Sequence, residues 1–143
     1  MENENIVITI KGKSSQDGKD TDVTNVSSQG VLEYLPGGLK IIYDDSTSVG
    51  VKGVTATLTA NKNGVITIER KGVLEHKLIV EKGKRHNCIY TTPYGNMNVG
   101  VFGVDVNNEL NLSGGKLKMK YTLDINSGLI SNNEIEISIK AAK

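Results

Sequence analysis

Two residues that could bind an anion, Arg70 and His76, interrupt apolar faces of predicted strands. Strict two-residue alternation places Arg70 on the side of Ile68 and His76 on the side of Leu78. A cationic or titratable group in a dry interior is costly unless it is paired, so such a group can hold the head of an anionic ligand. We therefore predict that Arg70 and His76 meet the polar end of a small ligand.

Three tyrosines, Tyr43, Tyr90 and Tyr121, fall on or near the same inward faces and could add hydroxyl donors along the wall of a cavity. A structural interpretation competes with this one. Arg70 lies beside a glycine turn, where it could reach out of the barrel mouth or bond a turn carbonyl. His76 could be a core or rim imidazole bonded to a neighbour. The sequence leaves both interpretations open.

A second group, His86 and Cys88, has the residue types of a thiolate and imidazole pair, and would make the protein a hydrolase-type enzyme. Residues two apart on a strand are about 6.5 Å from one another, which makes a direct hydrogen bond awkward. The alternative is a small buried thiol beside a hydrated histidine. A zinc site would need His76 and His86 to meet across their hairpin, and no signature spacing supports one. We therefore predict no metal and no cofactor.

Other charged segments carry no chemistry of their own. The acidic stretch Asp17–Asp22 lacks the glycine position and the bidentate glutamate of a calcium loop. The chain has no Trp and one Phe, so its basic groups lack the aromatic platforms of single-stranded nucleic-acid sites. A lysine stripe along one outer strand face should instead pair with carboxylates of the next strand. The basic groups are Lys82, Lys84 and Arg85 at a hairpin tip and the stripe Lys116, Lys118 and Lys120, with Glu134 and Glu136 as the expected partners of the stripe.

Length and composition predict a single domain over residues 1–143. The 17 basic and 16 acidic side chains give no overall field that would attract nucleic acid or an anionic membrane. The start of the chain is polar, and no apolar run has the length of a membrane helix. A single cysteine excludes an internal disulfide and is typical of a reducing compartment, so we expect a cytoplasmic protein.

The segments that must position these residues are ten short alternating runs separated by turn residues. Pro36-Gly37-Gly38 and Asn63-Gly64 predict tight hairpins, and every connection is short except Asp45–Gly53, which could be a flap over one barrel end. Consecutive strands should then pair as neighbours, and the first should close on the last. We predict an all-β protein, a closed antiparallel up-and-down barrel of about eight to ten strands. The expected strands cover residues 5–12, 22–35, 39–44, 54–60, 65–71, 73–81, 85–92, 96–106, 116–125 and 133–140.

One strand is apolar on both faces. Val99 and Val101 point to one side, while Phe102 and Val104 point to the other, which should face water. Because no helix is available to cover this outer face, a second copy of the protein is the expected cover.

Several motifs resemble those of one family. The run Ile89-Tyr90-Thr91-Thr92-Pro93-Tyr94-Gly95 resembles the Tyr-x-Thr-Pro-Tyr/Phe-Gly hallmark of the YwiB-like family, small bacterial proteins with a calycin-like β-barrel. Arg70-Lys71-Gly72 resembles the Arg-x-Gly turn of that family, and Gly114-Gly115 with Tyr121 resembles its Gly-Gly and Tyr segment. The resemblance spans nearly the whole chain. It implies the barrel fold and carries no catalytic assignment.

The sequence thus favours a non-enzymatic barrel that holds a small amphiphilic, partly apolar and anionic molecule in its lumen. Arg70, His76, Tyr43, Tyr90 and Tyr121 are the predicted ligand-binding residues. A packed barrel that dimerises through the face around Phe102 is the first alternative, and a hydrolase that uses Cys88 or His86 is the second.

Overall fold

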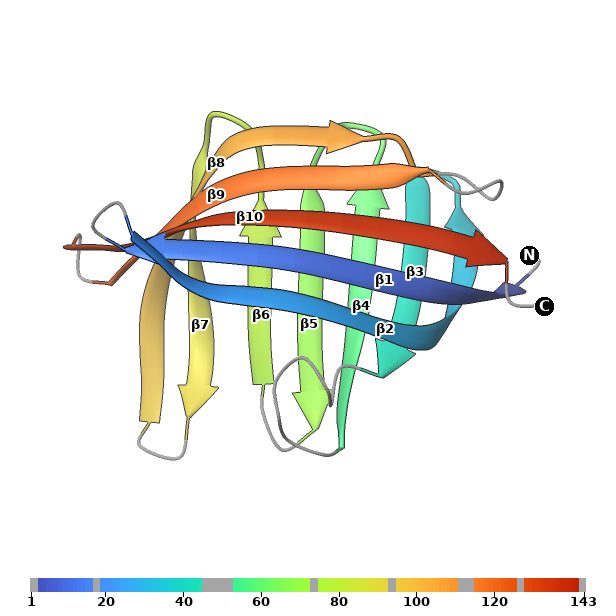
Figure 1. The fold of residues 1–143 in the computed structure, drawn as a ribbon, viewed down its shortest axis with the longest axis horizontal. Coiled ribbons are helices and arrows are strands. Elements are labelled where there is room, and N and C mark those ends of the chain that lie inside the picture. Colours follow the sequence, from blue (N-terminus) through green and yellow to red (C-terminus); the bar gives the residue numbers. More distant parts are fainter. Residues whose placement is uncertain are drawn as a thin grey trace.

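Ten antiparallel β-strands form the protein (Figure 1). The computed structural model describes residues 3–16, 19–44, 53–72, 75–92, 95–110, 115–125 and 128–141. The strands are β1 (Asn3–Gln16), β2 (Lys19–Leu35), β3 (Gly38–Asp44), β4 (Val54–Asn61), β5 (Ile66–Gly72), β6 (Glu75–Val80), β7 (Arg85–Thr92), β8 (Gly95–Asn108), β9 (Lys116–Ile125) and β10 (Gly128–Ala141). Among the described residues we find no helix long and apolar enough to span a membrane.

The sheet closes on itself, as predicted. Each strand pairs with its neighbours in the chain, and β1 pairs with β10 to complete the barrel. The closing register sets Ile8 opposite Ile139 and Ile10 opposite Ile137, so the apolar positions of both strands share the inward face. Closure satisfies the backbone groups that two open edges would leave exposed.

The barrel is flattened into two layers whose strands cross at a steep angle (Figure 1). One layer consists of β3 to β7, and the other contains β1, β9 and β10 with most of β2. Strand β8 belongs to both layers, because residues 95–102 pair with β7 and residues 99–108 pair with β9. A bulge between Gly103 and Asp105 lies in this long strand, where the extra residue lets the chain bend.

The apolar core lies between the two layers. It is built from alternate residues of every strand, and the centre is aliphatic. The largest side chains with less than 2% exposure are Ile8, Leu32, Ile41, Leu58, Ile66, Leu117, Met119 and Ile137. Burying one such side chain stabilises the fold by about 1.5–3 kcal/mol, so the core is the main source of stability.

Two strands extend further than their apolar pattern indicates. The polar stretch 13–21 was expected to break the first hairpin, but β1 continues to Gln16 and β2 begins at Lys19. Register pairs such as Lys13 with Val23 carry the ladder through this stretch. Backbone hydrogen bonds do not depend on side-chain polarity, so the strands of a hairpin can stay paired beyond their last apolar residues. The expected flap lies outside the described residues except for Gly53.

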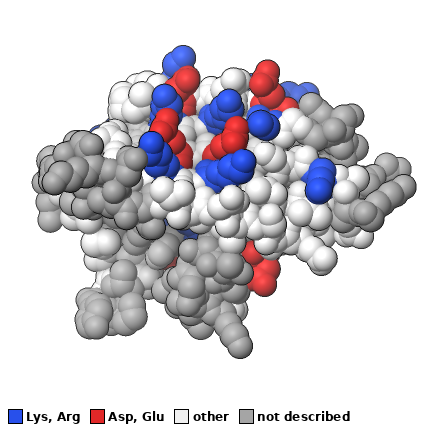
Figure 2. Space-filling view, viewed as in Figure 1, with Lys and Arg blue, Asp and Glu red and all other residues white. Residues whose placement is uncertain are grey.

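The predicted match between the lysine stripe and the next strand is confirmed on the outer wall. Lys120 pairs with Glu134 at 3.4 Å, while Lys116 and Lys118 share Glu136 at 3.6 and 3.8 Å. Figure 2 shows Lys and Arg side chains interleaved with carboxylates on the face that carries β9 and β10. Exposed ion pairs of this kind contribute at most about 1 kcal/mol each to the free energy of unfolding, so they are a minor source of the barrel's stability.

A stronger ion pair crosses the outer side of β8 where that strand has a glycine. Arg85 of β7 donates from Nη2 and Nε to the two carboxylate oxygens of Asp124 on β9, at 2.6 and 3.1 Å. The hydrogen bonds and charge of Arg85 hold the pKa of the Asp124 carboxyl below its ordinary value. A Cβ atom at Gly100 would overlap both charged groups. The missing side chain therefore lets a bidentate pair tie β7 to β9 across β8.

A second glycine on β8, Gly103, receives the hairpin between β6 and β7. Its N–H donates to the Lys84 carbonyl at 3.1 Å, and its own carbonyl accepts from the Gly83 N–H at 2.8 Å. A Cβ atom here would overlap the backbone of Glu81. Since backbone cannot move aside as a flexible side chain can, this contact requires glycine.

We expect Gly103→Ala to lower the free energy of unfolding by about 1–3 kcal/mol, because the added methyl group must displace the β6–β7 hairpin. Gly37→Ala is the matched control, since a Cβ atom at that turn position meets nothing within 4 Å. The control should change stability by less than about 0.5 kcal/mol. Urea unfolding followed by circular dichroism measures both variants, and equal stability of the two would contradict the packing described.

Candidate functional site

A lateral row of inward-facing residues crosses five neighbouring strands near one end of the barrel. In register, Tyr43 of β3 lies opposite Ala56, Ala56 opposite Arg70, Arg70 opposite His76, and His76 opposite Tyr90 of β7. Tyr43 is 3% exposed and Ala56 is fully buried, while the other three are partly buried. The row therefore gathers four of the five predicted ligand-binding residues on one inner face.

His76 is held between a ring and a cation. Its imidazole stacks on the phenol of Tyr90, with ring centroids 4.3 Å apart and planes inclined by 10°. Burial and, to a lesser degree, the positive charge of Arg70 lower the pKa of His76 below its ordinary 6.5. The imidazole is thus neutral at pH 7, and Arg70 is the permanent positive charge of the row.

The fifth predicted residue, Tyr121, reaches the same part of the interior from β9 in the other layer. It is 7% exposed. Burial, reinforced by the neighbouring Tyr90 phenol and opposed by Arg70, raises the pKa of Tyr121 far above its ordinary value. Burial also raises the pKa of Tyr90, again against the effect of Arg70. Both phenols consequently stay protonated and remain hydrogen-bond donors at any physiological pH.

Among the described residues we find no hydrogen-bond partner for the hydroxyl of Tyr90 or Tyr121. A buried tyrosine hydroxyl ordinarily has a partner, because leaving a buried polar group unbonded costs about 1–3 kcal/mol. Two protonated donors therefore lie near the guanidinium of Arg70.

Two polar residues of β10, Ser131 and Asn133, extend this region and were not predicted. Asn133 lies opposite Tyr121 in the register and donates from Nδ2 to the Ser131 hydroxyl at 2.9 Å. Ser131 is only 5% exposed. Their signal was present in the sequence, because they continue inward the alternation that Ile135 begins, as polar residues at apolar positions.

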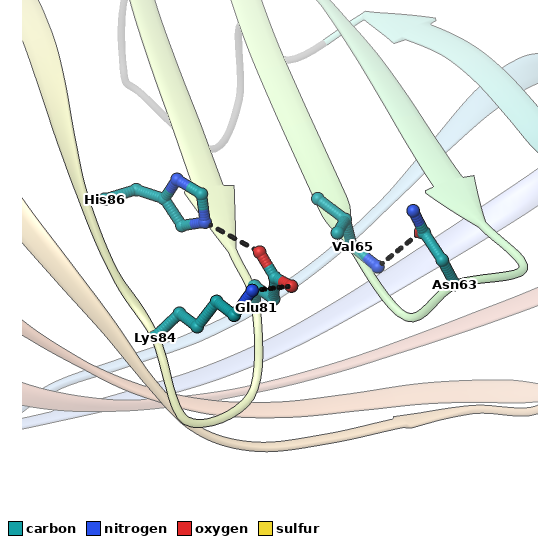
Figure 3. Close-up of polar contacts among 5 residues, drawn as sticks. All are labelled: Asn63, Val65, Glu81, Lys84 and His86. Carbon is teal, nitrogen blue, oxygen red and sulfur yellow. Dashed lines mark hydrogen bonds and ion pairs between the residues drawn. The ribbon is translucent and has the colours of Figure 1, made fainter.

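At the opposite end of β7, His86 bonds a carboxylate that sequence reasoning missed. Nε2 of His86 lies 3.0 Å from Oε1 of Glu81, and Nζ of Lys84 lies 3.5 Å from the other carboxylate oxygen (Figure 3). The hydrogen bond from His86 is the main cause that lowers the pKa of Glu81. The Glu81 carboxylate thus contacts both His86 and Lys84, and these contacts help to stabilise the tip of the β6–β7 hairpin.

Cys88 is buried, with 3% exposure, and burial raises the pKa of its thiol. A backbone hydrogen bond from Ile79 and the charge of Lys77 oppose that rise and do not reverse it. The thiol therefore stays protonated at neutral pH, which is the property of a structural rather than a nucleophilic cysteine.

The pairing considered for a zinc site is wrong. The register sets His76 opposite Tyr90, so His86 lies four residues further along β7, at a distance of about 13 Å. The described residues contain no group of three or more His, Cys, Asp or Glu side chains that could hold a metal. Alternation predicts the correct face for each histidine but not the residue that lies opposite it across the hairpin.

The two-sided apolar strand is present as predicted. Val99 and Val101 are buried, whereas Phe102 is 39% and Val104 48% exposed on the outer wall. Arg85 lies opposite Phe102 in the register, and its ion pair bounds the patch on one side. The exposed apolar area is accordingly narrow.

The fold and the polar row define the class: an all-β closed barrel with a polar group at one end of an apolar interior. The family model described as "Domain of unknown function (DUF1934)" matches residues 8–137, and the chain belongs to this family. A crystal structure of the ywiB protein from Bacillus subtilis is similar over 99% of this chain and 94% of that chain, with a TM-score of 0.86 and 13% identity. That likeness confirms the fold predicted from the family resemblance. No curated protein matches the chain.

The lowered pKa of His76 predicts how stability changes with pH. The unfolded chain, with the histidine near its ordinary 6.5, takes up a proton more readily than the folded barrel. This group therefore costs no stability above about pH 6.5 and destabilises the fold as pH falls below that value. Urea unfolding from about pH 8 to about pH 5 should show a smaller loss for His76→Gln than for the wild type. Parallel curves for the two proteins would contradict the assignment.

Proposed function

We propose that the protein is a non-enzymatic binding protein that holds a small, partly apolar and anionic molecule inside the barrel. Its polar end would meet Arg70, His76, Tyr90 and Tyr121, with Tyr43 completing the wall. The single observation that carries the proposal is a pair of protonated tyrosine hydroxyls that have no hydrogen-bond partner within the described ranges and lie near a guanidinium in a largely buried setting.

The charge of the row supports an oxyanion as the head group. The row itself contains the cation Arg70 and no carboxylate. An oxyanion accepts hydrogen bonds and donates none, which matches the donors of Arg70, Tyr90 and Tyr121. Hydrogen bonds to a charged group contribute about 1.5–3 kcal/mol each.

The residues next to the row support an apolar tail. Ile68 and Leu78 follow Arg70 and His76 along their own strands and are each 2% exposed. A molecule whose head lies at the row would pass directly from polar donors to aliphatic side chains. An amphiphile such as a fatty acid has this division, and apolar contact with a few polar anchors is the usual make-up of a ligand site.

The chemistry of the single cysteine supports a reducing, cytoplasmic location. Cys88 is a free, buried thiol, and such a thiol needs no oxidising compartment. Its burial also makes the hydrolase alternative the weaker one, since neither a thiolate nor an accessible sulfur is present.

Thermal shift and calorimetry with straight-chain fatty acids test the proposal. At a ligand concentration of 100 times Kd, the wild type should gain about 2.7 kcal/mol of stability. Arg70→Gln should weaken binding by about tenfold to a hundredfold, through loss of a charged hydrogen bond. Lys62→Ala is the matched control, because this cation is exposed at the turn between β4 and β5, at the other end of β5 from Arg70. Absence of binding by every anionic amphiphile tried, or unchanged affinity of Arg70→Gln, would refute the proposal.

A second candidate function is assembly of two copies through the patch of Phe102 and Val104. The supporting observation is the exposure of these two apolar side chains, 39% and 48%, on one outer strand. Phe102→Asp would place a charge in the contact, so we expect it to convert a wild-type dimer to monomers in sedimentation velocity. A wild-type protein that already sediments as a monomer would remove this candidate.

A further inference from the structure

The hairpin of β6 and β7 is paired at its base and at its tip but not between them. The ladder contains Glu75 opposite Thr91 and His76 opposite Tyr90, and pairing resumes only at the bridge between Glu81 and Lys84. Residues 77–80 and 86–89 are all described, and they form no ladder pairs with one another. We call this interrupted stretch the β6–β7 seam.

The seam is a local feature of one strand boundary. On its other side β6 is fully bonded to β5, with register pairs that run without interruption from Arg70 opposite His76 to Ile66 opposite Val80. Strand β7 is likewise paired with β8 along its whole length, from Arg85 to Thr92. Both lips of the seam are therefore held by rigid neighbours, while few backbone hydrogen bonds hold them to each other.

Cys88 contacts the backbone across the seam. A backbone hydrogen bond from the Ile79 N–H of β6 reaches the Cys88 sulfur of β7. Sulfur is a weak acceptor, so this contact costs less to break than a backbone hydrogen bond. The seam is consequently a part of the wall that can open locally without loss of the barrel.

A hollow on the outer wall leads to the same place. It has a volume of about 420 Å³ and lies over β5, β6 and β7. Its lining includes Arg70 and His76, the two head-binding residues of the row, together with Lys77 and Ile89 from the two lips of the seam. Ile89 is 55% exposed, which provides an apolar contact for a ligand tail at the surface. Glu69, Glu75 and Lys71 complete the charged lining, so the head of an amphiphile in this hollow would meet three cations and two carboxylates beside the apolar lip.

We propose that the β6–β7 seam is the passage through which the ligand reaches the interior, with the outer hollow as its first docking point. The inference rests on the proposed binding function. In the hollow, the ligand head would lose bound water and contact Arg70. Separation of β6 from β7 at the seam would then let the ligand tail pass Cys88 into the core. The loops at the barrel ends are the alternative route, and the test separates the two.

A reversible lock across the seam provides the kinetic test. Extending the register of His76 with Tyr90 by two residues brings position 78 opposite position 88, so we expect Leu78→Cys to face the native Cys88. Association and dissociation of a fatty acid are measured by stopped flow on this variant, oxidised and then reduced. Oxidation should slow both rates by about tenfold and leave Kd within about twofold, because a gate changes rates rather than the bound state. Reduction should restore the rates.

A second lock serves as the matched control. Thr59 and Thr67 lie opposite each other in the complete ladder of β4 and β5, so Thr59→Cys with Thr67→Cys introduces a cross-link away from the seam. Its oxidation should leave both rates unchanged. Equal rates for oxidised and reduced Leu78→Cys would overturn the passage while the binding function stands, and absence of binding by the wild type would refute the binding function itself.

Amide hydrogen exchange of the unmodified protein gives a readout that needs neither ligand nor variant. Residue Ile68 lies in complete ladders on both sides, whereas the Ile79 N–H faces the seam. We expect the Ile79 amide to exchange at least about tenfold faster than the Ile68 amide in NMR experiments. Equal or slower exchange of Ile79 would overturn the seam, and this result decides the matter if the two cysteines fail to join.

Discussion

Removal of water from the barrel interior gives the polar row its properties. In water Arg70, His76, Tyr90 and Tyr121 would be four ordinary side chains. Inside the barrel the cost of desolvating a charge lowers the pKa of His76 and raises the pKa of Tyr90 and Tyr121, which widens the pH range over which the guanidinium is the one charge of the row. The same dryness makes unbonded hydroxyl groups costly, and it would strengthen any hydrogen bond that an anion formed there.

The dry interior depends in turn on the way the sheet bends round itself. Strand β8 carries the chain from one layer to the other, and it does so with two glycines and a bulge. Gly100 lets the Arg85–Asp124 pair pass over the strand, and Gly103 admits the β6–β7 hairpin. The Arg85–Asp124 ion pair on the outer wall and the two glycines of β8 thus together stabilise the bend where β8 passes from one layer to the other.

Alternation in the sequence predicted which side each residue faces, and this was sufficient for the closed barrel and for the inward positions of Arg70 and His76. Pairing across a hairpin was harder to predict. Register depends on turns and bulges, so the histidines do not meet and the seam left no trace in the pattern. Glu81 was missed because its role arises from the tip geometry, whereas Asn133 was visible as a polar residue at an apolar position.

The pairing of β1 with β10 also has a consequence for the order of events during synthesis. Ile8 of β1 can pair with Ile139 only after all the strands between β1 and β10 have been synthesised. Contacts so distant in sequence form slowly, because a long loop must close before the contact contributes any stability. The nascent β1–β2 hairpin therefore has an unprotected edge until β10 has been made, and a chaperone that shields sheet edges would matter most at this stage.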